Sequence, residues 1–134
     1  MAKHHAARAL ALVGTPFRPQ GRKIEQGLDC VGVALCAFDL RAETVRDNYR
    51  LRGRHLPEIR HALGSHFRKV SRSAATAGDL LLLSVAPDQY HLAILTEAGF
   101  VHADAGLRKV VETPGEPPWS LVAAFRRRIR KRGK

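Results

Sequence analysis

One cysteine of this sequence stands where a helix is expected to begin, a position that suits a nucleophilic sulfur. Asp29 is a good N-cap for the apolar segment after it, which places Cys30 in the first helical turn. First-turn N–H groups are unpaired, and the positive helix end favours a thiolate. We therefore expect a lowered thiol pKa at Cys30, and oxyanion support from the helix start at Asp29 and Val31. A cysteine in an apolar helix is also a common core residue, so the chemistry needs a base.

Two histidines further along the chain could serve that sulfur. His91 lies in one alternating segment, residues 90–95, and His102 lies in another, residues 100–104. If the two segments pair as a hairpin with an even-numbered loop, both imidazoles share a face, with Cβ atoms roughly 5–8 Å apart. His91 would then be the base, and His102 would accept its Nδ1–H and fix its tautomer. Asp104, on the same strand face, is a rival for that orienting role.

The elements that must position these residues predict an α+β fold, with N-terminal helices packed on a small antiparallel sheet. Residues 4–13 and 30–40 favour helices, separated by a polar loop. Small residues in the second helix, among them Gly32, would let another element approach closely. Pro57 predicts the first turn of a third helix that runs to about Phe67. The expected strands, within a strand-like region over 78–111 and beyond it, are residues 80–84, 90–95, 100–103 and 119–125.

The 134 residues fit one domain, which we place at residues 1–125, followed by a basic tail at 126–134 that is expected to fray. The net charge of +11 favours polyanionic partners. Cys30 and Cys36 would face different sides of a helix, so a disulfide between them is not expected. The N-terminal stretch lacks the features of a signal peptide, because Arg8 interrupts its apolar run and no small-residue cleavage site follows. No apolar run approaches the ~20 residues of a membrane span.

Five segments in this order resemble the NlpC-type cell-wall peptidases: residues 14–18 (GTPFR), 27–32 (GLDCVG), 78–81 (GDLL), 91–94 (HLAI) and 100–103 (FVHA). Within that family the chain looks most like the small peptidases of phage tails and gene transfer agents. The resemblance implies a pared-down papain-like fold, with Cys30 as nucleophile, His91 as base and His102 as orienter. It also implies a thiol peptidase that cuts peptidoglycan stem peptides, with Phe17 and Asp104 in the substrate cleft and neither metal nor cofactor.

The same resemblance implies partners and a location. Tail or baseplate hub proteins would be partners, and the protein would be made in the cytoplasm, join a virion or tail, and act on the periplasmic wall. Family members often carry Ser after the cysteine and Tyr at the position of Phe17. Here Val31 and Phe17 remove two polar groups near the sulfur, which keeps open a docking module with a dormant site.

Two alternatives remain from the residues alone. A basic nucleic-acid-binding module is poorly supported, because no aromatic-rich stacking surface accompanies the basic tail. Cys30, His91 and His102 could also be three ligands of a zinc site with an open position, although a cysteine at a helix start serves a nucleophile better.

Overall fold

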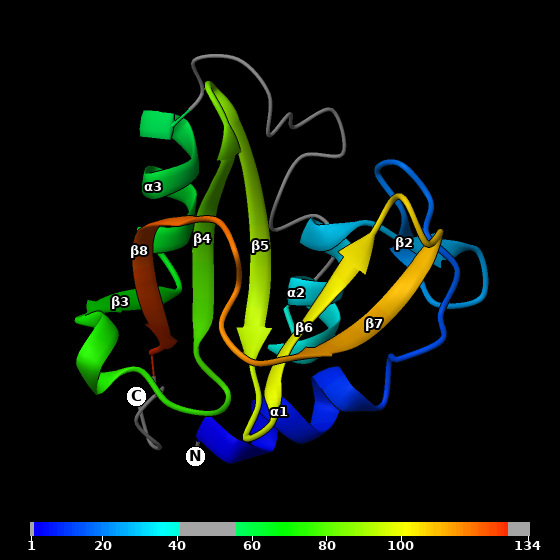
Figure 1. The fold of residues 1–134 in the computed structure, drawn as a ribbon, viewed down its shortest axis with the longest axis horizontal. Helices are drawn as coiled ribbons and strands as arrows, with labels where there is room; N and C mark the ends of the chain where they lie inside the picture. The colour runs from blue at the N-terminus through cyan, green and yellow to red at the C-terminus, as the bar shows by residue number, and fades with distance from the viewer. Residues whose placement is uncertain (1, 41–55, 129–134) are drawn as a thin grey trace.

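Three helices and a six-stranded sheet make up most of the computed structural model, which describes residues 2–40 and 56–128 (Figure 1). The helices are α1 (Ala2–Leu10), α2 (Cys30–Ala37) and α3 (Leu56–Gly64). The strands are β1 (Arg22–Lys23), β2 (Gly27–Leu28), β3 (Phe67–Val70), β4 (Leu80–Ala86), β5 (Gln89–Leu95), β6 (Gly99–Asp104), β7 (Lys109–Pro114) and β8 (Ser120–Arg127). No helix in these ranges is long and apolar enough to cross a membrane.

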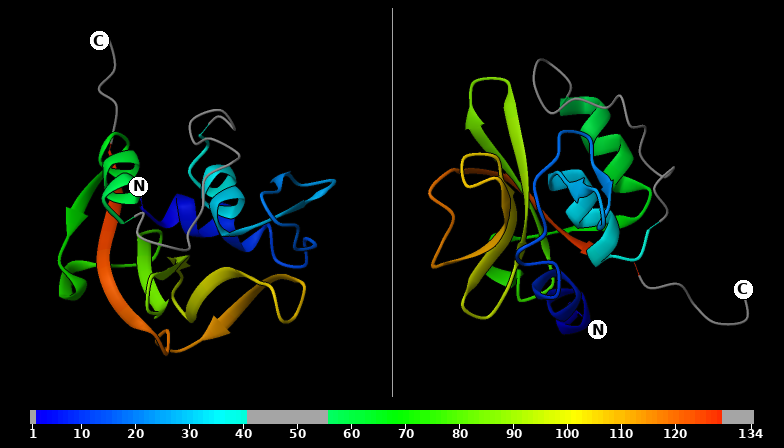
Figure 2. Two further views of the ribbon diagram at one scale, coloured as in Figure 1. Left: turned by 90° about the horizontal axis from the view of Figure 1, so that it is seen from above. Right: turned by 90° about the vertical axis from the view of Figure 1, so that its right-hand side faces the viewer.

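The main sheet is antiparallel throughout, with strand order β3-β8-β4-β5-β6-β7. Helices α1 and α2 pack together and against β5, and α2 also contacts β6, so both lie over one face of the sheet (Figure 2). This confirms the predicted α+β fold with helices on an antiparallel sheet.

Strand β4 shows why the sheet is stable at its centre. Leu80 and Leu82 point into the cluster under α1 and α2, whereas Leu81 and Leu83 point into a second cluster on the opposite face. All four side chains are buried, with at most 1% of their surface exposed. A strand that is covered on both faces has apolar residues at consecutive positions, which explains the LLLL sequence here.

Strands β5 and β6 pair only near the turn that joins them. The paired residues are Leu95 with Phe100 and Ile94 with Val101. Beyond these two pairs the strands diverge, β5 remaining with β4 and β6 with β7 (Figure 1). His91 and His102 therefore lie beyond the paired stretch, where the two strands diverge.

The structure corrects several expected element boundaries. The third helix ends at Gly64, and Phe67 instead begins β3, where it pairs with Arg127 and packs edge-on against Phe38. The sequence gives no separate sign of β7, which pairs with β6 along its whole length. Strand β8 runs to Arg127, two residues into the expected tail. Residues 129–134 of that tail lie outside the described ranges.

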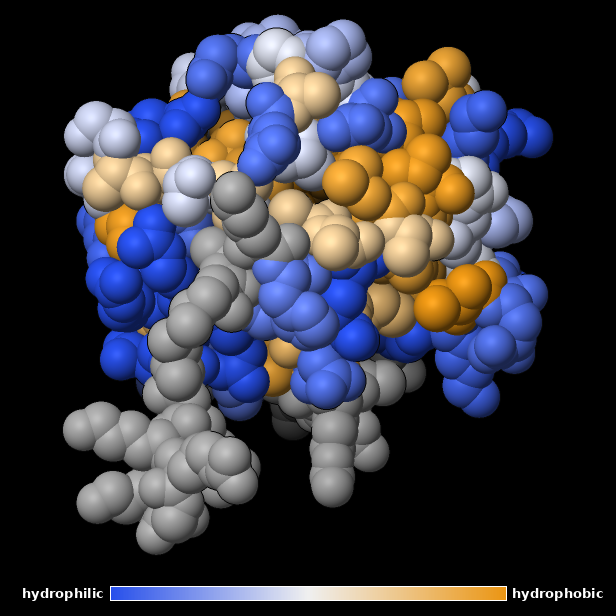
Figure 3. All heavy atoms as spheres, turned by 90° about the horizontal axis from the view of Figure 1, so that it is seen from below, coloured by the Kyte–Doolittle hydropathy of each residue, from blue (hydrophilic) through white to orange (hydrophobic). Residues whose placement is uncertain are grey.

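Among the described residues most apolar side chains are buried, and the large ones that remain exposed are Leu10, Val13, Ile24, Leu107 and Leu121. Figure 3 shows apolar and hydrophilic regions side by side on the face seen from below. Scattered exposed apolar residues are normal for a protein of this size and indicate no binding surface by themselves.

Candidate active site

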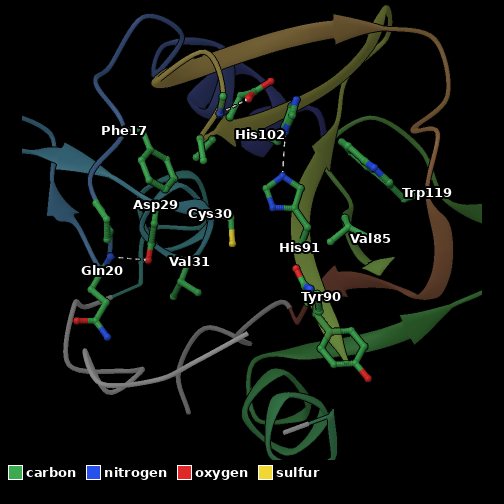
Figure 4. A pocket seen from close by; sticks show the side chains of 16 residues that line it. Phe17, Gln20, Asp29, Cys30, Val31, Val85, Tyr90, His91, His102 and Trp119 are labelled. Atoms are coloured by element: carbon green, nitrogen blue, oxygen red, sulfur yellow. Dashed lines mark hydrogen bonds between the residues drawn. The ribbon is translucent and has the colours of Figure 1, made fainter. Parts of the chain in front are cut away.

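A pocket of about 650 Å³ lies between the start of α2, the diverging ends of β5 and β6, and Trp119 (Figure 4). Cys30, His91 and His102 all line it, so the three residues expected to act together lie at one site. Asp29, Val31, Phe17 and Asp104 line the same pocket. All the residues that the sequence analysis assigned to a site are therefore neighbours in space.

The first turn of α2 places the thiol. Asp29 is the N-cap, and its Oδ1 accepts a hydrogen bond of 2.8 Å from the backbone N–H of Gly32. Cys30 follows as the first helical residue and is only 7% exposed. Burial raises the pKa of the thiol, and the backbone N–H groups of Leu92 and Val31 offset only part of that rise. Helix α2 packs against β5, the strand that carries His91 and Leu92.

The Asp29 carboxylate also ties the loop before α2 to the helix. Its Oδ1 accepts a 2.9 Å hydrogen bond from Nη1 of Arg22, and its Oδ2 accepts a 3.0 Å bond from the backbone N–H of Gln20. The Arg22 side chain is only 9% exposed, so this ion pair is largely buried. Breaking one partner of such a pair leaves an uncompensated charge, which makes the pair a strong constraint on the helix start.

Gly32 brings α2 into direct backbone contact with that loop, and Gly21 lets the loop pack closely on itself. A Cβ atom added to Gly32 would lie 2.1 Å from the carbonyl oxygen of Gly21. A Cβ atom on Gly21 would in turn lie 2.2 Å from the carbonyl oxygen of Gly27. This confirms the expectation that the small residue at position 32 admits a close neighbour.

The two histidines form a hydrogen-bonded pair. His91 Nε2 lies 2.8 Å from His102 Nδ1, and the ring planes are nearly perpendicular at 85°. The expectation that His91 would use Nδ1 toward His102 is wrong, because Nε2 makes that bond. Nδ1 of His91 is instead turned toward Cys30 (Figure 4). The ring thus has one nitrogen for the partner histidine and one for the thiol side of the pocket.

Burial sets the protonation states of these groups. It raises the pKa of the Cys30 thiol to about 12, with a further increase from the Asp29 carboxylate. The expected lowering of the thiol pKa by the helix end is therefore wrong, because desolvation is larger. Burial also lowers the pKa of His91 to about 4 and lowers that of His102. At neutral pH the resting site holds a neutral thiol beside a neutral imidazole.

Asp104 does not take the orienting role for which it competes with His102. Its Oδ1 accepts hydrogen bonds from the backbone N–H groups of Gly106 and Leu107, at 2.8 and 3.1 Å, and so closes the turn after β6. Its charge still acts on the site. Burial lowers the pKa of both His91 and His102, and the Asp104 carboxylate offsets part of that lowering. The hydrogen bond of His91 goes to His102.

Two residues that sequence reasoning misses lie against the histidine pair. The Trp119 ring stands edge-on to His91 and His102, with centroids 5.6 and 5.7 Å away. Thr113 Oγ1 lies 3.4 Å from His102 Nε2. Thr113 and His102 are diagonal neighbours across β6 and β7, since Phe100 pairs with Thr113 and His102 with Val111. Once that register is known, the pattern of alternate residues identifies Thr113.

Among residues 2–40 and 56–128, no group of three or more His, Cys, Asp or Glu side chains is arranged to hold a metal ion.

The fold is that of the papain-like NlpC/P60 domains, as three solved structures show. The chain matches NlpC1 from Trichomonas vaginalis with a TM-score of 0.67 at 12% identity, covering 92% of this chain and 42% of that one. It matches the NlpC/p60 domain of the peptidoglycan hydrolase SagA with a TM-score of 0.58 at 27% identity, covering 85% and 89%. It matches the peptidoglycan hydrolase RipB from Mycobacterium tuberculosis with a TM-score of 0.60 at 18% identity, covering 92% and 62%.

These likenesses differ in how much of each protein they cover. The chain spans less than half of NlpC1 but nearly the whole SagA domain. No protein-family model and no curated protein sequence matches the chain. The comparisons establish the papain-like NlpC/P60 fold.

Proposed function

We propose that this chain is a cysteine peptidase that hydrolyses amide bonds in peptidoglycan stem peptides. The observation that carries the proposal is the pocket in which Cys30, at the mouth of α2, faces Nδ1 of His91 while Nε2 of His91 bonds His102 (Figure 4). A nucleophile, a base and a group that orients the base are the parts that acyl transfer needs.

In the first half of the proposed reaction, neutral His91 takes the thiol proton at Nδ1 as the sulfur attacks the substrate carbonyl. The low pKa of His91 keeps Nδ1 unprotonated and ready at neutral pH. The N–H groups at the start of α2 stabilise the oxyanion that forms. When the C–N bond breaks, His91 gives its proton to the leaving amine, and a thioester on Cys30 remains.

In the second half, water replaces the amine. His91 removes a proton from the water as its oxygen attacks the thioester carbonyl. The C–S bond then breaks, the carboxylic acid leaves, and the proton on His91 returns to the sulfur. Each turnover therefore consumes one water and restores the neutral thiol and imidazole of the resting site.

The substrate class is supported by the SagA domain and RipB, both described as peptidoglycan hydrolases. The SagA domain is the more informative of the two, because its identity with this chain is 27% over 89% of its length. The net charge of +11 also suits substrates rich in carboxylates, such as wall stem peptides.

Digestion of purified muropeptides by wild type, Cys30→Ala and Cys36→Ala tests this function. Wild type and Cys36→Ala should release the same new amino termini, whereas Cys30→Ala should lose activity by a factor of at least ~10³. Equal cleavage by Cys30→Ala and wild type would eliminate Cys30 as nucleophile. Inactivity of all three folded proteins on every muropeptide would eliminate the substrate class.

We further propose that the chain works in a phage-tail-like particle, made in the cytoplasm, joined to hub proteins and acting on the periplasmic wall. The support for this context is the resemblance of the sequence to the small peptidases of phage tails and gene transfer agents. The test is quantitative mass spectrometry of purified particles from cells that encode the chain. Stoichiometric recovery in the particle is expected, and its presence only in the soluble fraction would exclude this context.

A further inference from the structure

The proposed chemistry fixes which nitrogen of each histidine must carry a proton. His91 must keep Nδ1 free to accept the thiol proton, so its own proton belongs on Nε2. That proton can then be donated only to His102 Nδ1, 2.8 Å away. His102 Nδ1 must therefore be unprotonated, and the proton of a neutral His102 belongs on Nε2.

Thr113 provides the acceptor that this arrangement requires. Its Oγ1 lies 3.4 Å from His102 Nε2. It comes from the edge strand β7 and lies diagonally across from His102 on the same face of the sheet. Within the described residues this hydroxyl is the polar group bonded to that nitrogen.

Water has little access to the same nitrogen. His102 is only 4% exposed. Its ring is flanked by Phe100, at a centroid distance of 5.0 Å, and by Trp119, at 5.7 Å. Removing the hydroxyl would thus leave a donor in an apolar enclosure, where an unpaired polar group is unfavourable. The alternative is for His102 to move its proton to Nδ1.

We propose that Thr113 is a positioning residue that holds the proton of His102 on Nε2, and through it the proton of His91 on Nε2. If His102 instead carries its proton on Nδ1, that N–H donates the hydrogen bond to Nε2 of His91. Nε2 of His91 is then the acceptor, so the proton of His91 must lie on Nδ1. In that form His91 cannot take the thiol proton. The hydroxyl acts on the sulfur through the two histidines, and Thr113 does not itself line the pocket.

This inference rests on the proposed function for its importance, but its first test needs no substrate. Imidazole ¹⁵N chemical shifts of the protein in a Cys36→Ser background report the tautomer of each ring. Both His91 and His102 should be Nε2–H in the parent protein. Thr113→Val, which keeps the shape of the side chain, should populate Nδ1–H at His102, and Thr113→Ser should restore Nε2–H.

The second test is the rate at which iodoacetamide alkylates Cys30 at neutral pH in the same background. Thr113→Val should slow alkylation by about 5- to 10-fold, the effect of one lost hydrogen bond on a barrier. Thr113→Ser should return it to within about twofold of the parent, the range expected for a retained hydroxyl. On muropeptides, kcat should fall with Thr113→Val while KM changes little.

The outcomes separate this inference from the proposed function. An Nδ1–H tautomer at His102 in the parent protein overturns the inference whatever the variants do. So does a Thr113→Val variant with parental shifts and parental alkylation. Correct tautomers and slowed alkylation in a protein that cleaves no muropeptide would uphold the role of Thr113 and reject the substrate.

Discussion

The two ends of helix α2 each carry a cysteine, and the surroundings of the two thiols differ. Cys30, at the amino end, lies under the N-cap Asp29 and lines the pocket that contains the histidine pair. Cys36, at the carboxyl end, is half-buried and does not line that pocket. Burial raises the pKa of both thiols. The difference between them is the neighbouring imidazole, since Nδ1 of His91 is turned toward Cys30 (Figure 4).

The carboxyl end is built for stability instead. Arg8 from α1 donates from Nη2 to the carbonyl oxygen of Cys36 at 2.9 Å and from Nε to that of Ala37 at 3.2 Å. Carbonyl groups at a helix end lack partners within the helix, so a cation there satisfies them. One short helix thus has one end beside the histidine pair and one end bonded to α1. The surroundings of a cysteine, more than the helix that carries it, set the chemistry open to it.

The largest expected effect comes from removing His91, which leaves Cys30 at the amino end without the imidazole that is turned toward it. His91→Ala removes the base, so hydrolysis should fall by about 10²–10⁴, and Cys30 should react with iodoacetamide no faster than Cys36. Alkylation rates of the two cysteines are measured by peptide mass spectrometry. His61→Ala, an exposed residue of α3, is the control and should leave both rates unchanged. A Cys30 that stays as reactive without His91 would remove the distinction between the ends.

The next largest effect is expected from acid, which should lower the free energy of unfolding through His91. The pKa of His91 is about 4 in the folded protein, below the ordinary 6.5, so unfolding takes up a proton as pH falls below 6.5. Stability from the neutral imidazole is complete above pH 6.5 and is lost as pH falls toward 4, by on the order of 3 kcal/mol. His102, whose pKa is also lowered, acts in the same direction. Urea unfolding at several pH values measures the slope, which should be shallower in His91→Asn.

Asp29→Asn should destabilise the start of α2 while keeping the N-cap hydrogen bond. An amide oxygen can still accept from the N–H of Gly32, but the largely buried Arg22 loses its ion pair with Asp29. We expect a loss of about 2–3 kcal/mol in unfolding free energy. The thiol pKa of Cys30 should fall, because the Asp29 charge raises it. Urea unfolding and the pH dependence of alkylation check the two effects. An unchanged thiol pKa would mean that this carboxylate does not act on the sulfur.

The smallest effect is expected at the carboxyl end. Arg8→Met removes hydrogen bonds to two helix-end carbonyls and should cost about 1–2 kcal/mol. It should leave the alkylation rate of Cys30 within about twofold, since the loss is local. Arg8→Lys, which keeps the charge, should recover part of the stability. A large change in Cys30 reactivity would show that the two ends are coupled through the helix.

Local sequence signals predict the parts of the site that depend on neighbours along the chain. The N-cap at Asp29 and the shared face of His91 and His102 follow from capping chemistry and strand alternation. Alternation also identifies residues 90–95 and 100–103 as strands, a continuous apolar run identifies residues 80–84, and β4, β5 and β6 contain them.

The features that the sequence does not predict depend on contacts between distant segments. Which nitrogen of His91 meets His102 depends on ring orientation in the folded site. The thiol pKa depends on how fully β5 buries Cys30, which the helix start alone does not indicate. Thr113 requires the register of β6 with β7, and Trp119 requires the course of the loop after β7. The sequence places Phe67 at the end of the third expected helix, but it lies in a strand and pairs with the distant Arg127.

The backbone contact between Gly21 and Gly32 determines how much the nucleophile can be displaced. No side chain lies between the loop and the helix there, so no rotamer change can absorb a shift of one against the other. The main chain of residues 21–32 therefore sets the position of the sulfur. A single methyl group at Gly32 would have to separate the loop from the helix, and Cys30, two residues before Gly32, would move with the helix.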